Sequence, residues 1–239
     1  MDKLGQLDQS VTQTDRAYAA LLEEILSCRL APGAKITISE VATKLGLSPG
    51  AVREALSRLS AEKMTVATAQ KGFSVAEVSI EELKDLTRTR ITIEQLCLVS
   101  AIKHGDVEWE SAIVAAYHRL HRIPMVVLGE TPRLDPAWAT AHTTFHAALA
   151  AGCNSRWLLT IRGMLYAQTE RYRYLSVALA RQNRNVDAEH KAILDACLAR
   201  EPDLACELID DHLMRTSNIL LRSPLLQASP SELQSTPGE

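Results

Sequence analysis

The sequence predicts a mainly α-helical protein, in which an N-terminal winged helix-turn-helix with a small β-hairpin wing precedes an all-α helical bundle. Aromatic residues make up only 4% of the 239 residues while Ala and Leu are abundant, and this composition favours helix. Apolar residues recur three and four positions apart along most of the chain, which is the period of a helix with one buried face. The alternation that is typical of strands is concentrated in residues 64–78.

The overall composition limits the partners that the protein can have. A formal net charge of −3 excludes a generally basic nucleic-acid binder, so any contact with DNA must come from a local patch. The five cysteines are scattered and never spaced as Cys-x2-Cys, which argues against a disulfide framework and a zinc ribbon. The polar N-terminus does not resemble a signal peptide, and no run of eighteen apolar residues could span a membrane. We therefore expect a cytoplasmic protein with no membrane partner.

Four segments follow from the pattern along the chain. Residues 1–14 are polar and expected to be flexible, and residues 15–78 are expected to form the winged helix-turn-helix domain. Residues 79–222 are expected to form the helical bundle. The Pro- and Ser-rich residues 223–239 are expected to be a disordered tail.

The N-terminal domain is predicted to begin with a helix from Asp15, as its N-cap, to Arg29. After a Pro-Gly turn, Ser39 is expected to cap a short helix that ends at Gly46, because Gly is the usual residue just beyond a helix C-terminus. This helix would be the first of two that are joined by a tight turn.

The second of these helices is predicted to open with Ser48 as N-cap and Pro49 at the first helical position. Its apolar positions share one face, which we expect to be buried. The residues expected on the opposite, outer face are Gly50, Arg53 and Ser57. Two short helices with an exposed arginine near the start of the second are typical of a helix-turn-helix, in which that arginine reaches the edges of the bases.

The charges of this region support contact with DNA. From Arg29 to Lys71 the chain has seven Lys and Arg residues against three Glu, which gives a local charge of +4. The strands on either side of residues 69–72 predict a hairpin wing whose Lys71 could reach a phosphate or the minor groove. The alternative is an ordinary small helical domain with a hairpin. The candidate DNA-contacting residues are Ser48, Gly50, Arg53, Ser57, Arg58, Lys71 and Gly72.

Four histidines fall on the inward faces of helices predicted in the second half of the chain. His142 and His146 lie one turn apart on an apolar face, and His190 and His212 each share a face with aliphatic residues. Several helices of a bundle can direct imidazoles to one point, which would make a divalent metal site. The alternative is that each is a hydrogen-bonded core residue, the commoner role of a single buried histidine.

An arginine also falls on an inward face. Arg90 lies on the apolar face of a helix predicted between Leu83 and Gly105, where an unpaired charge would be costly. Glu94, one turn later, is one candidate partner, and the carboxylate of a ligand is the other. A helix over residues 155–179 adds further candidates for binding such a ligand, namely Gln168, Tyr172, Arg171 and Arg173.

Residues 123–136 contain three of the nine prolines and a glycine. We expect them to form a loop or a broken helix beside this pocket.

Residues 25–83, "ILSCRLAPGAKITISEVATKLGLSPGAVREALSRLSAEKMTVATAQKGFSVAEVSIEEL", resemble the N-terminal domain of GntR-family transcriptional regulators almost end to end. "LKDLTRTRITIEQLCLVSAIKHG" is similar to the opening helix of the FadR-type, metal-binding FCD ligand-binding domain. The stretches "TTFHAALAAGCN", "EHKAIL" and "DDHLM" fall where that domain has its metal-binding histidines. The resemblance covers about residues 15–222.

The resemblance implies a ligand-responsive DNA-binding regulator, which we expect to be a repressor of an operon for organic-acid or amino-acid catabolism. It implies a homodimer on a palindromic double-stranded operator. It also implies an effector that is a small carboxylate or dicarboxylate, for which glutarate-like acids are the first choice, bound at a divalent metal.

This chain departs from the family at three positions. The family often has arginine where Ser39 and Pro49 stand, which leaves only Arg53 of three common DNA-contacting arginines. Many metal-binding members have aspartate where His142 stands. Because imidazole is a softer ligand than carboxylate, we expect the metal to be zinc, with nickel or cobalt as the alternatives, rather than manganese.

Two other functions are compatible with parts of the pattern. A metal-dependent hydrolase could use a His-rich site, but no motif supplies a general base, and Glu189 is expected to point away from the histidines. A metal-free regulator of an acyl ligand would have no use for four inward histidines.

Overall fold

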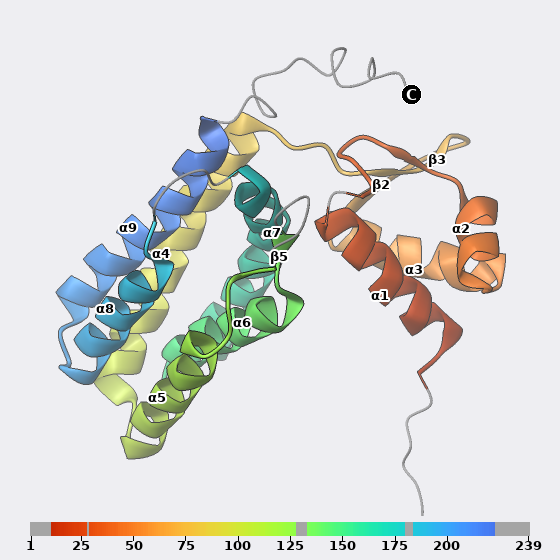
Figure 1. Ribbon diagram of the computed structural model, residues 1–239. Coiled ribbons are helices and arrows are strands. Elements are labelled where there is room, and N and C mark those ends of the chain that lie inside the picture. Colours follow the sequence, from red (N-terminus) through yellow and green to blue (C-terminus); the bar gives the residue numbers. More distant parts are fainter. Residues whose placement is uncertain (1–10, 28, 128–132, 180–183, 223–239) are drawn as a thin grey trace, which may run out of the picture. The chain divides into compact units, whose positions relative to one another are not determined.

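Figure 1 shows the computed structural model of the chain, which describes residues 11–27, 29–127, 133–179 and 184–222. The chain divides into two compact units, Met1–Glu77 and Val78–Glu239, so the division falls one residue before the expected boundary. The expected tail over residues 223–239 and most of the expected flexible N-terminus lie outside the described residues.

The N-terminal unit is a small helical domain with a three-stranded sheet. Its elements in chain order are α1 (Gln13–Leu26), β1 (Lys35–Ile36), α2 (Ile38–Leu45), α3 (Pro49–Ala61), β2 (Thr65–Thr68) and β3 (Gly72–Val75). Both α1 and α2 pack against α3. Among the side chains in its core are Leu21, Ile25, Val52, Leu56, Leu59 and Phe73. The inward face of α3 is therefore the apolar face that the sequence predicts.

The helix-turn-helix forms from local signals. Gly46 ends α2 in the left-handed conformation, with φ of 63°, which only glycine adopts without cost. Ser48 then caps α3, where its side chain accepts a hydrogen bond from Ala51 N at 3.2 Å, and Pro49 occupies the first turn. The predicted turn and the predicted start of the second helix are both confirmed.

Two predicted N-caps are wrong. α1 begins at Gln13, after Thr12, and Asp15 is the third helical residue, where it exchanges hydrogen bonds with Thr12 in a capping box. Thr12 is the N-cap, and Asp15 is its partner in the capping box. Residues 13 and 14, expected to be flexible, are helical. Ser39 likewise lies inside α2, which follows Thr37. The C-terminus of α1 is Leu26 and not Arg29.

The predicted wing is the hairpin of β2 and β3, which pair antiparallel from Thr65 opposite Val75 to Thr68 opposite Gly72. β3 also pairs with β1, so that the strand order is β1-β3-β2. A two-residue strand such as β1 has no alternation that a sequence could reveal.

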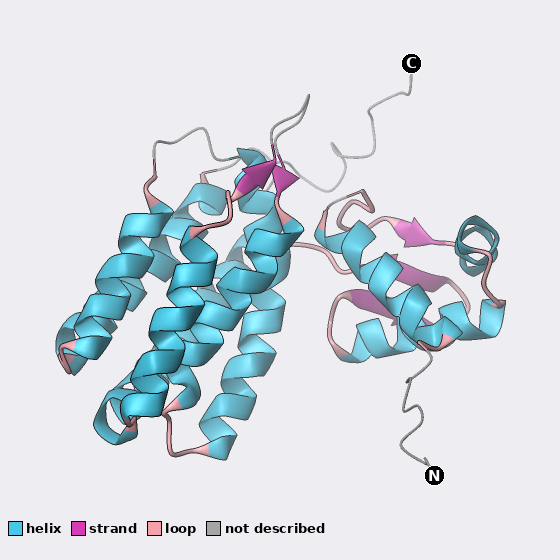
Figure 2. Ribbon diagram, turned by 60° about the horizontal axis from the view of Figure 1, so that its bottom comes forward, coloured by secondary structure: helices cyan, strands magenta, loops and turns pink. Residues whose placement is uncertain are grey.

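The C-terminal unit is a helical bundle. Its elements are α4 (Ile80–His104), α5 (Val107–His121), β4 (Val126–Val127), β5 (Arg133–Leu134), α6 (Pro136–Ala151), α7 (Arg156–Leu179), α8 (Val186–Leu198) and α9 (Pro202–Leu221). α4 packs along α9 and α7, α5 along α6, and α8 along α9. Figure 2 shows that nearly all of this unit is helix. None of the described helices is long and apolar enough to cross a membrane.

The segment over residues 123–136 is not simply a loop or a broken helix. Its described parts, β4 and β5, pair antiparallel as a two-stranded ribbon, which lies at one end of the bundle (Figure 2). Asp135 N donates to Met125 O at 3.0 Å, and Leu134 is buried in the main core. Proline and glycine obscured this ribbon because they are typical of both loops and short edge strands.

Candidate functional site

The four inward histidines come together in the C-terminal unit. We call His142, His146, His190 and His212 the His cluster. Two of them lie on α6, one on α8 and one on α9, and all four are at least 96% buried. Each offers a nitrogen within 4.8 Å of the corresponding atoms of the other three. His142 Nε2 and His146 Nε2 are 3.1 Å apart.

Aromatic side chains fix the rings of the His cluster. The Trp138 ring stacks on His142 with centroids 4.6 Å apart. Phe145 presents its ring at a steep angle to His190 and His146, with centroid separations of 5.2 and 5.5 Å. Because α6 places Trp138, His142 and Phe145 on one buried face, a single helix supplies both candidate ligand atoms and the aromatic wall that orients them.

Burial keeps the His cluster neutral. It lowers the pKa of His142, His146 and His190 well below the usual value, and neighbouring positive charges lower each further. The pKa of His212 is lowered by burial too, although its hydrogen bond to Glu189 opposes this. At neutral pH the imidazoles therefore have the unprotonated nitrogens that a metal ion requires.

Glu189 does not point away from the site as expected. Its Oε2 lies 2.8 Å from His212 Nδ1, and Arg184 holds the same carboxylate through Nε at 2.9 Å. The prediction considered α8 alone, on which Glu189 is turned away from the face of His190. α9 packs along α8 and brings His212 to that side. Carboxylate oxygens commonly accept from the outer nitrogen of a metal-binding histidine, and they orient its ring.

The donor set of the His cluster fits a divalent metal ion. His146 Nδ1 and His190 Nε2 are buried and have no hydrogen-bond partner among the described residues. Nitrogens that each lie about 2.0–2.1 Å from one tetrahedral zinc ion are about 3.3–3.4 Å apart, so the 3.1 Å between His142 Nε2 and His146 Nε2 needs to lengthen by only a few tenths of an ångström. Four neutral imidazoles suit zinc, nickel, copper or cobalt better than manganese or magnesium.

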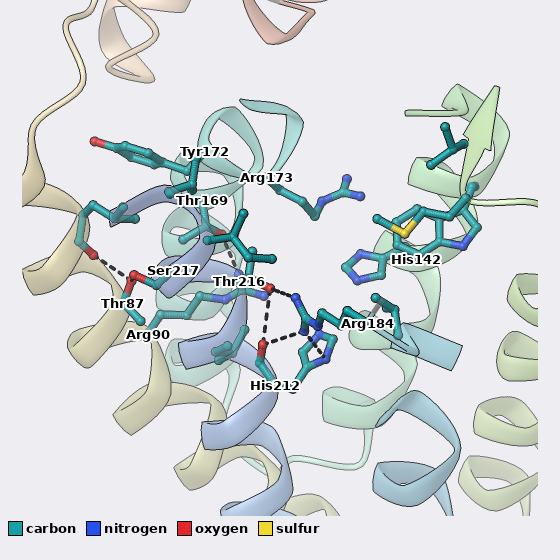
Figure 3. Close-up of a pocket in the computed structure, with 18 residues that line it drawn as sticks. Thr87, Arg90, His142, Thr169, Tyr172, Arg173, Arg184, His212, Thr216 and Ser217 are labelled. Carbon is teal, nitrogen blue, oxygen red and sulfur yellow. Dashed lines mark hydrogen bonds between the residues drawn. The ribbon is translucent and has the colours of Figure 1, made fainter. Parts of the chain in front are cut away.

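A cavity of about 280 Å³ opens beside the His cluster, and His142 and His212 form part of its wall (Figure 3). Three arginines line it, Arg90, Arg173 and Arg184, together with the hydroxyls of α4, α7 and α9. The described residues of the lining include no aspartate or glutamate. The charged groups that face the cavity are therefore cationic, although each arginine pairs with a carboxylate behind the lining, and a divalent cation in the His cluster would add positive charge that no described ion pair balances.

Arg90 has the partner that the sequence suggests, but shares it. Arg90 Nε lies 3.4 Å from Glu94 Oε1, while Arg162 Nε donates to Glu94 Oε2 at 2.7 Å. Arg90 also donates to Thr169 Oγ1 at 2.6 Å. Two buried guanidiniums thus share one carboxylate, which leaves one excess positive charge at the cavity.

The other arginines of the cavity differ in what the sequence revealed. Arg173 lies on the cavity, where it pairs with Glu170 and sits over the Trp138 ring. The sequence predicts neither Arg184 nor Arg162 as a cavity or core residue, because neither lies in a motif. Arg162 of α7 pairs with Glu94 on α4, and Arg184 precedes α8 and pairs with Glu189 inside it. The sequence signal for Arg162 was its place four residues before Tyr166 on the inward face of α7.

The remaining candidate effector residues have different positions. Tyr172 is buried and lines the cavity, and its hydroxyl donates to Glu82 Oε2 at 2.8 Å. Gln168 is half-buried on α7 and is not one of the described lining residues. The side chain of Arg171 lies outside the described residues.

The candidate DNA-contacting residues lie on α3 and at the wing. Gly50, Arg53 and Ser57 are on the exposed face of α3, and Lys71 and Gly72 are exposed at the hairpin turn. The Ser48 side chain caps α3. Arg58 is also exposed, but it forms an ion pair with Asp15 at 2.9 Å and lies over the Tyr18 ring of α1. The structure thus gives Arg58 an intramolecular role that the sequence did not suggest.

A helix-turn-helix domain followed by a helical bundle with a cavity defines a class of DNA-binding protein with a separate ligand domain. Comparison with known proteins identifies the family. Residues 13–75 match the model of bacterial regulatory proteins of the gntR family, and residues 85–215 match the FCD domain. The uncharacterized HTH-type transcriptional regulator BphR of Paraburkholderia xenovorans (strain LB400) is 35% identical over 213 residues, covering 89% of this chain and 87% of that protein. The HTH-type transcriptional repressor GlaR of Escherichia coli (strain K12) is 32% identical over 209 residues, covering 86% and 94%.

A solved structure agrees with this result. That of E. coli McbR/YncC has the same fold, with a TM-score of 0.69 and 19% sequence identity, and the match covers 88% of this chain and 97% of that one. The chain belongs to the GntR family of bacterial transcriptional regulators, in the FadR-like subfamily with an FCD domain. It is a DNA-binding transcriptional regulator and not an enzyme.

Proposed function

We propose that the protein is a metal-containing repressor whose affinity for operator DNA is controlled by a small carboxylate or dicarboxylate. One observation carries this proposal, namely that four neutral imidazoles stand beside a cavity lined by three arginines and by no described carboxylate. Each arginine has a carboxylate partner behind the lining, but a divalent metal held by neutral imidazoles would add a charge that an entering anion can balance. When bound, the metal would supply a positive charge and open coordination positions for the acid's oxygens.

The size and charge of the cavity support a small acid. About 280 Å³ is slightly below the usual range of about 300–1,000 Å³ for ligand sites, which favours an acid of a few carbons over a long acyl chain. Arg90 is the residue best placed to hold a second anionic group, because it lines the cavity and shares Glu94 with Arg162. Arg173 and Arg184 are the further candidates. Glutarate is the first acid to test.

A hydrolase is the weaker alternative. The only described carboxylate in contact with the His cluster is Glu189, and it accepts from His212, Arg184 and Arg215. A carboxylate held by three donors is a poor general base, because its pKa is far below the usual value.

The proposed repressor acts as a homodimer on a palindromic operator in the cytoplasm. A single winged helix-turn-helix contacts too little DNA for useful specificity, and two copies related by symmetry read two half-sites. We expect the regulated genes to encode enzymes for the catabolism of organic acids or amino acids. The genes beside the regulator would indicate which acid is the effector.

The metal content of the protein tests the centre directly. We expect elemental analysis of protein purified without added metal to find about one equivalent of a divalent transition metal, with zinc favoured. His146→Ala removes one of four ligands and is expected to reduce the content strongly. His118→Ala is the matched control, because His118 is exposed on α5 and far from the cluster in sequence. Wild-type protein without stoichiometric metal, or His146→Ala with an unchanged content, would show that the cluster is only part of the core.

A further inference from the structure

His142 differs from His212 in that its outer nitrogen meets a hydroxyl and not a carboxylate. Its Nδ1 lies 3.1 Å from the hydroxyl oxygen of Tyr166. That hydroxyl donates to Thr143 Oγ1 at 3.2 Å, and Thr143 Oγ1 donates in turn to the backbone oxygen of Ala139 at 2.9 Å. His142 and Tyr166 are 4% and 6% exposed, so the contact between them is shielded from bulk water, whereas Thr143 is an exposed residue at the outer end of the chain.

The direction of every proton in this chain follows from what each group can do. A carbonyl oxygen cannot donate, so the Thr143 hydroxyl proton lies toward Ala139. Thr143 Oγ1 is then an acceptor for Tyr166, whose single hydroxyl proton is thereby used. The Tyr166 oxygen can therefore only accept from His142, which requires a proton on His142 Nδ1.

A neutral imidazole has one proton, so a proton on Nδ1 leaves Nε2 with a lone pair. In His142 that nitrogen is 3.1 Å from His146 Nε2, on the side where the cluster converges. The reversed chain, with Tyr166 donating to Nδ1, would put the proton on Nε2 and prevent it from binding a metal.

We propose that Tyr166 and Thr143 hold His142 in the Nδ1–H tautomer and so present its Nε2 as a metal ligand. This inference rests on the proposed function, because it assigns these residues a positioning role toward the metal centre. Glu189 has the corresponding role toward His212, whose Nδ1 it accepts from at 2.8 Å. The two relays differ in charge, since the one on His142 adds none.

Two variants and one matched control test the relay. Tyr166→Phe removes the acceptor for Nδ1–H. Thr143→Val is nearly isosteric and removes the acceptor for the Tyr166 proton, which can then be donated to His142. Thr144→Val is the control, because Thr144 is the next residue of the same helix and its exposed hydroxyl donates only to Thr140 O, at 2.9 Å, among the contacts that the structure describes. Circular dichroism checks that each variant is folded.

The first readout is the tautomer in the metal-free protein. Full-length protein labelled with ¹⁵N at histidine is treated with a chelator, and a long-range ¹H–¹⁵N correlation spectrum at neutral pH reports which nitrogen of each ring is protonated. His142→Gln assigns the resonance. We expect Nδ1–H for His142 in the wild type and in Thr144→Val, and an increased Nε2–H population in Thr143→Val. Nε2–H in the wild type would overturn the inference.

The second readout is zinc affinity, measured by competition with a chromophoric chelator. Loss of an outer-shell partner typically costs about 10–100-fold in metal affinity, and we expect a loss in this range for Tyr166→Phe and Thr143→Val but not for Thr144→Val. If the wild type binds zinc and both variants bind it equally well, the relay has no positioning role. If the wild type binds no zinc, the proposed metal centre fails, and the tautomer spectrum alone then supports or refutes the relay.

Discussion

Whether a buried histidine is a core residue or a ligand depends on the partners of its two ring nitrogens. In the His cluster, Nδ1 of His142 and Nδ1 of His212 have partners on the outer side, while Nε2 of His142 and Nε2 of His146 lie 3.1 Å apart on the inner side. His146 Nδ1 and His190 Nε2 have none among the described residues. An unsatisfied buried polar group costs about 1–3 kcal/mol, so each of these two nitrogens is costly for a core residue that binds no ligand.

At the DNA-binding face, the residue that we expect to carry specificity is Arg53. It is exposed near the start of α3, where a bidentate contact with guanine contributes about 1–3 kcal/mol of discrimination. Arg53→Ala is therefore expected to weaken binding to the operator more than binding to unrelated DNA. Fluorescence anisotropy with both DNAs at one salt concentration measures this, using operator fragments selected by the protein from random DNA. Arg88→Ala, an exposed arginine of α4, is the control. Unchanged affinity and selectivity in Arg53→Ala would remove it from the interface.

The residues that the sequence could not reveal are those whose partners come from another part of the fold. The four histidines were found because each lies on the apolar face of its own helix. Arg162, Arg184 and Glu189 were not, because their roles depend on which helices lie side by side. The Tyr166 relay also joins α7 to α6. Periodicity identifies which face of a helix is buried, but not what that face meets.

At the scale of elements, signals confined to a few residues were predicted best. The turn between α2 and α3 follows from Gly46, Ser48 and Pro49, which act within one turn of chain. The strands β1, β4 and β5 are two residues long and are stabilised by pairing with other segments, so their own sequences carry little information. The cap of α1 was misplaced by three residues because both partners of a capping box, Thr12 and Asp15, have side chains suited to be caps.

Two glycines of the helix-turn-helix allow a matched test of this turn. A Cβ added at Gly46 or at Gly50 would meet no atom within 4 Å, so any difference between the substitutions reflects the backbone alone. Gly46 has φ of 63°, and Gly46→Ala is expected to cost about 1 kcal/mol. Gly50 is helical, and Gly50→Ala is expected to stabilise α3 by about 0.5–1 kcal/mol. Hydrogen exchange of peptides from residues 38–61 in the full chain reads out both effects. Equal effects of the two substitutions would mean that the turn does not depend on the left-handed residue.

For the whole molecule, the proposed function requires that the acid and the operator influence each other's binding. A ligand changes DNA affinity only by as much as it prefers one state of the protein over another. Couplings in such proteins are typically about 1–3 kcal/mol, or roughly 5–150-fold. Because the coupling is a property of the protein with both ligands, it must be the same in either direction.

We therefore expect glutarate, or another acid if glutarate does not bind, to lower the affinity of the protein for operator DNA. Operator DNA should lower the affinity of the protein for the acid by the same factor. Calorimetry gives the affinity of the metal-loaded protein for the acid with and without operator, and anisotropy gives the affinity for operator with and without saturating acid, all at one salt concentration because DNA affinity falls steeply with salt. Arg90→Gln should weaken the acid in both states, since Arg90 lines the cavity, yet leave operator affinity without acid close to that of the wild type. If the acid binds equally well with and without operator, the cavity has no regulatory role. If the acid and the operator change each other's affinity by different factors, a third ligand, such as the metal, was exchanged during the measurement.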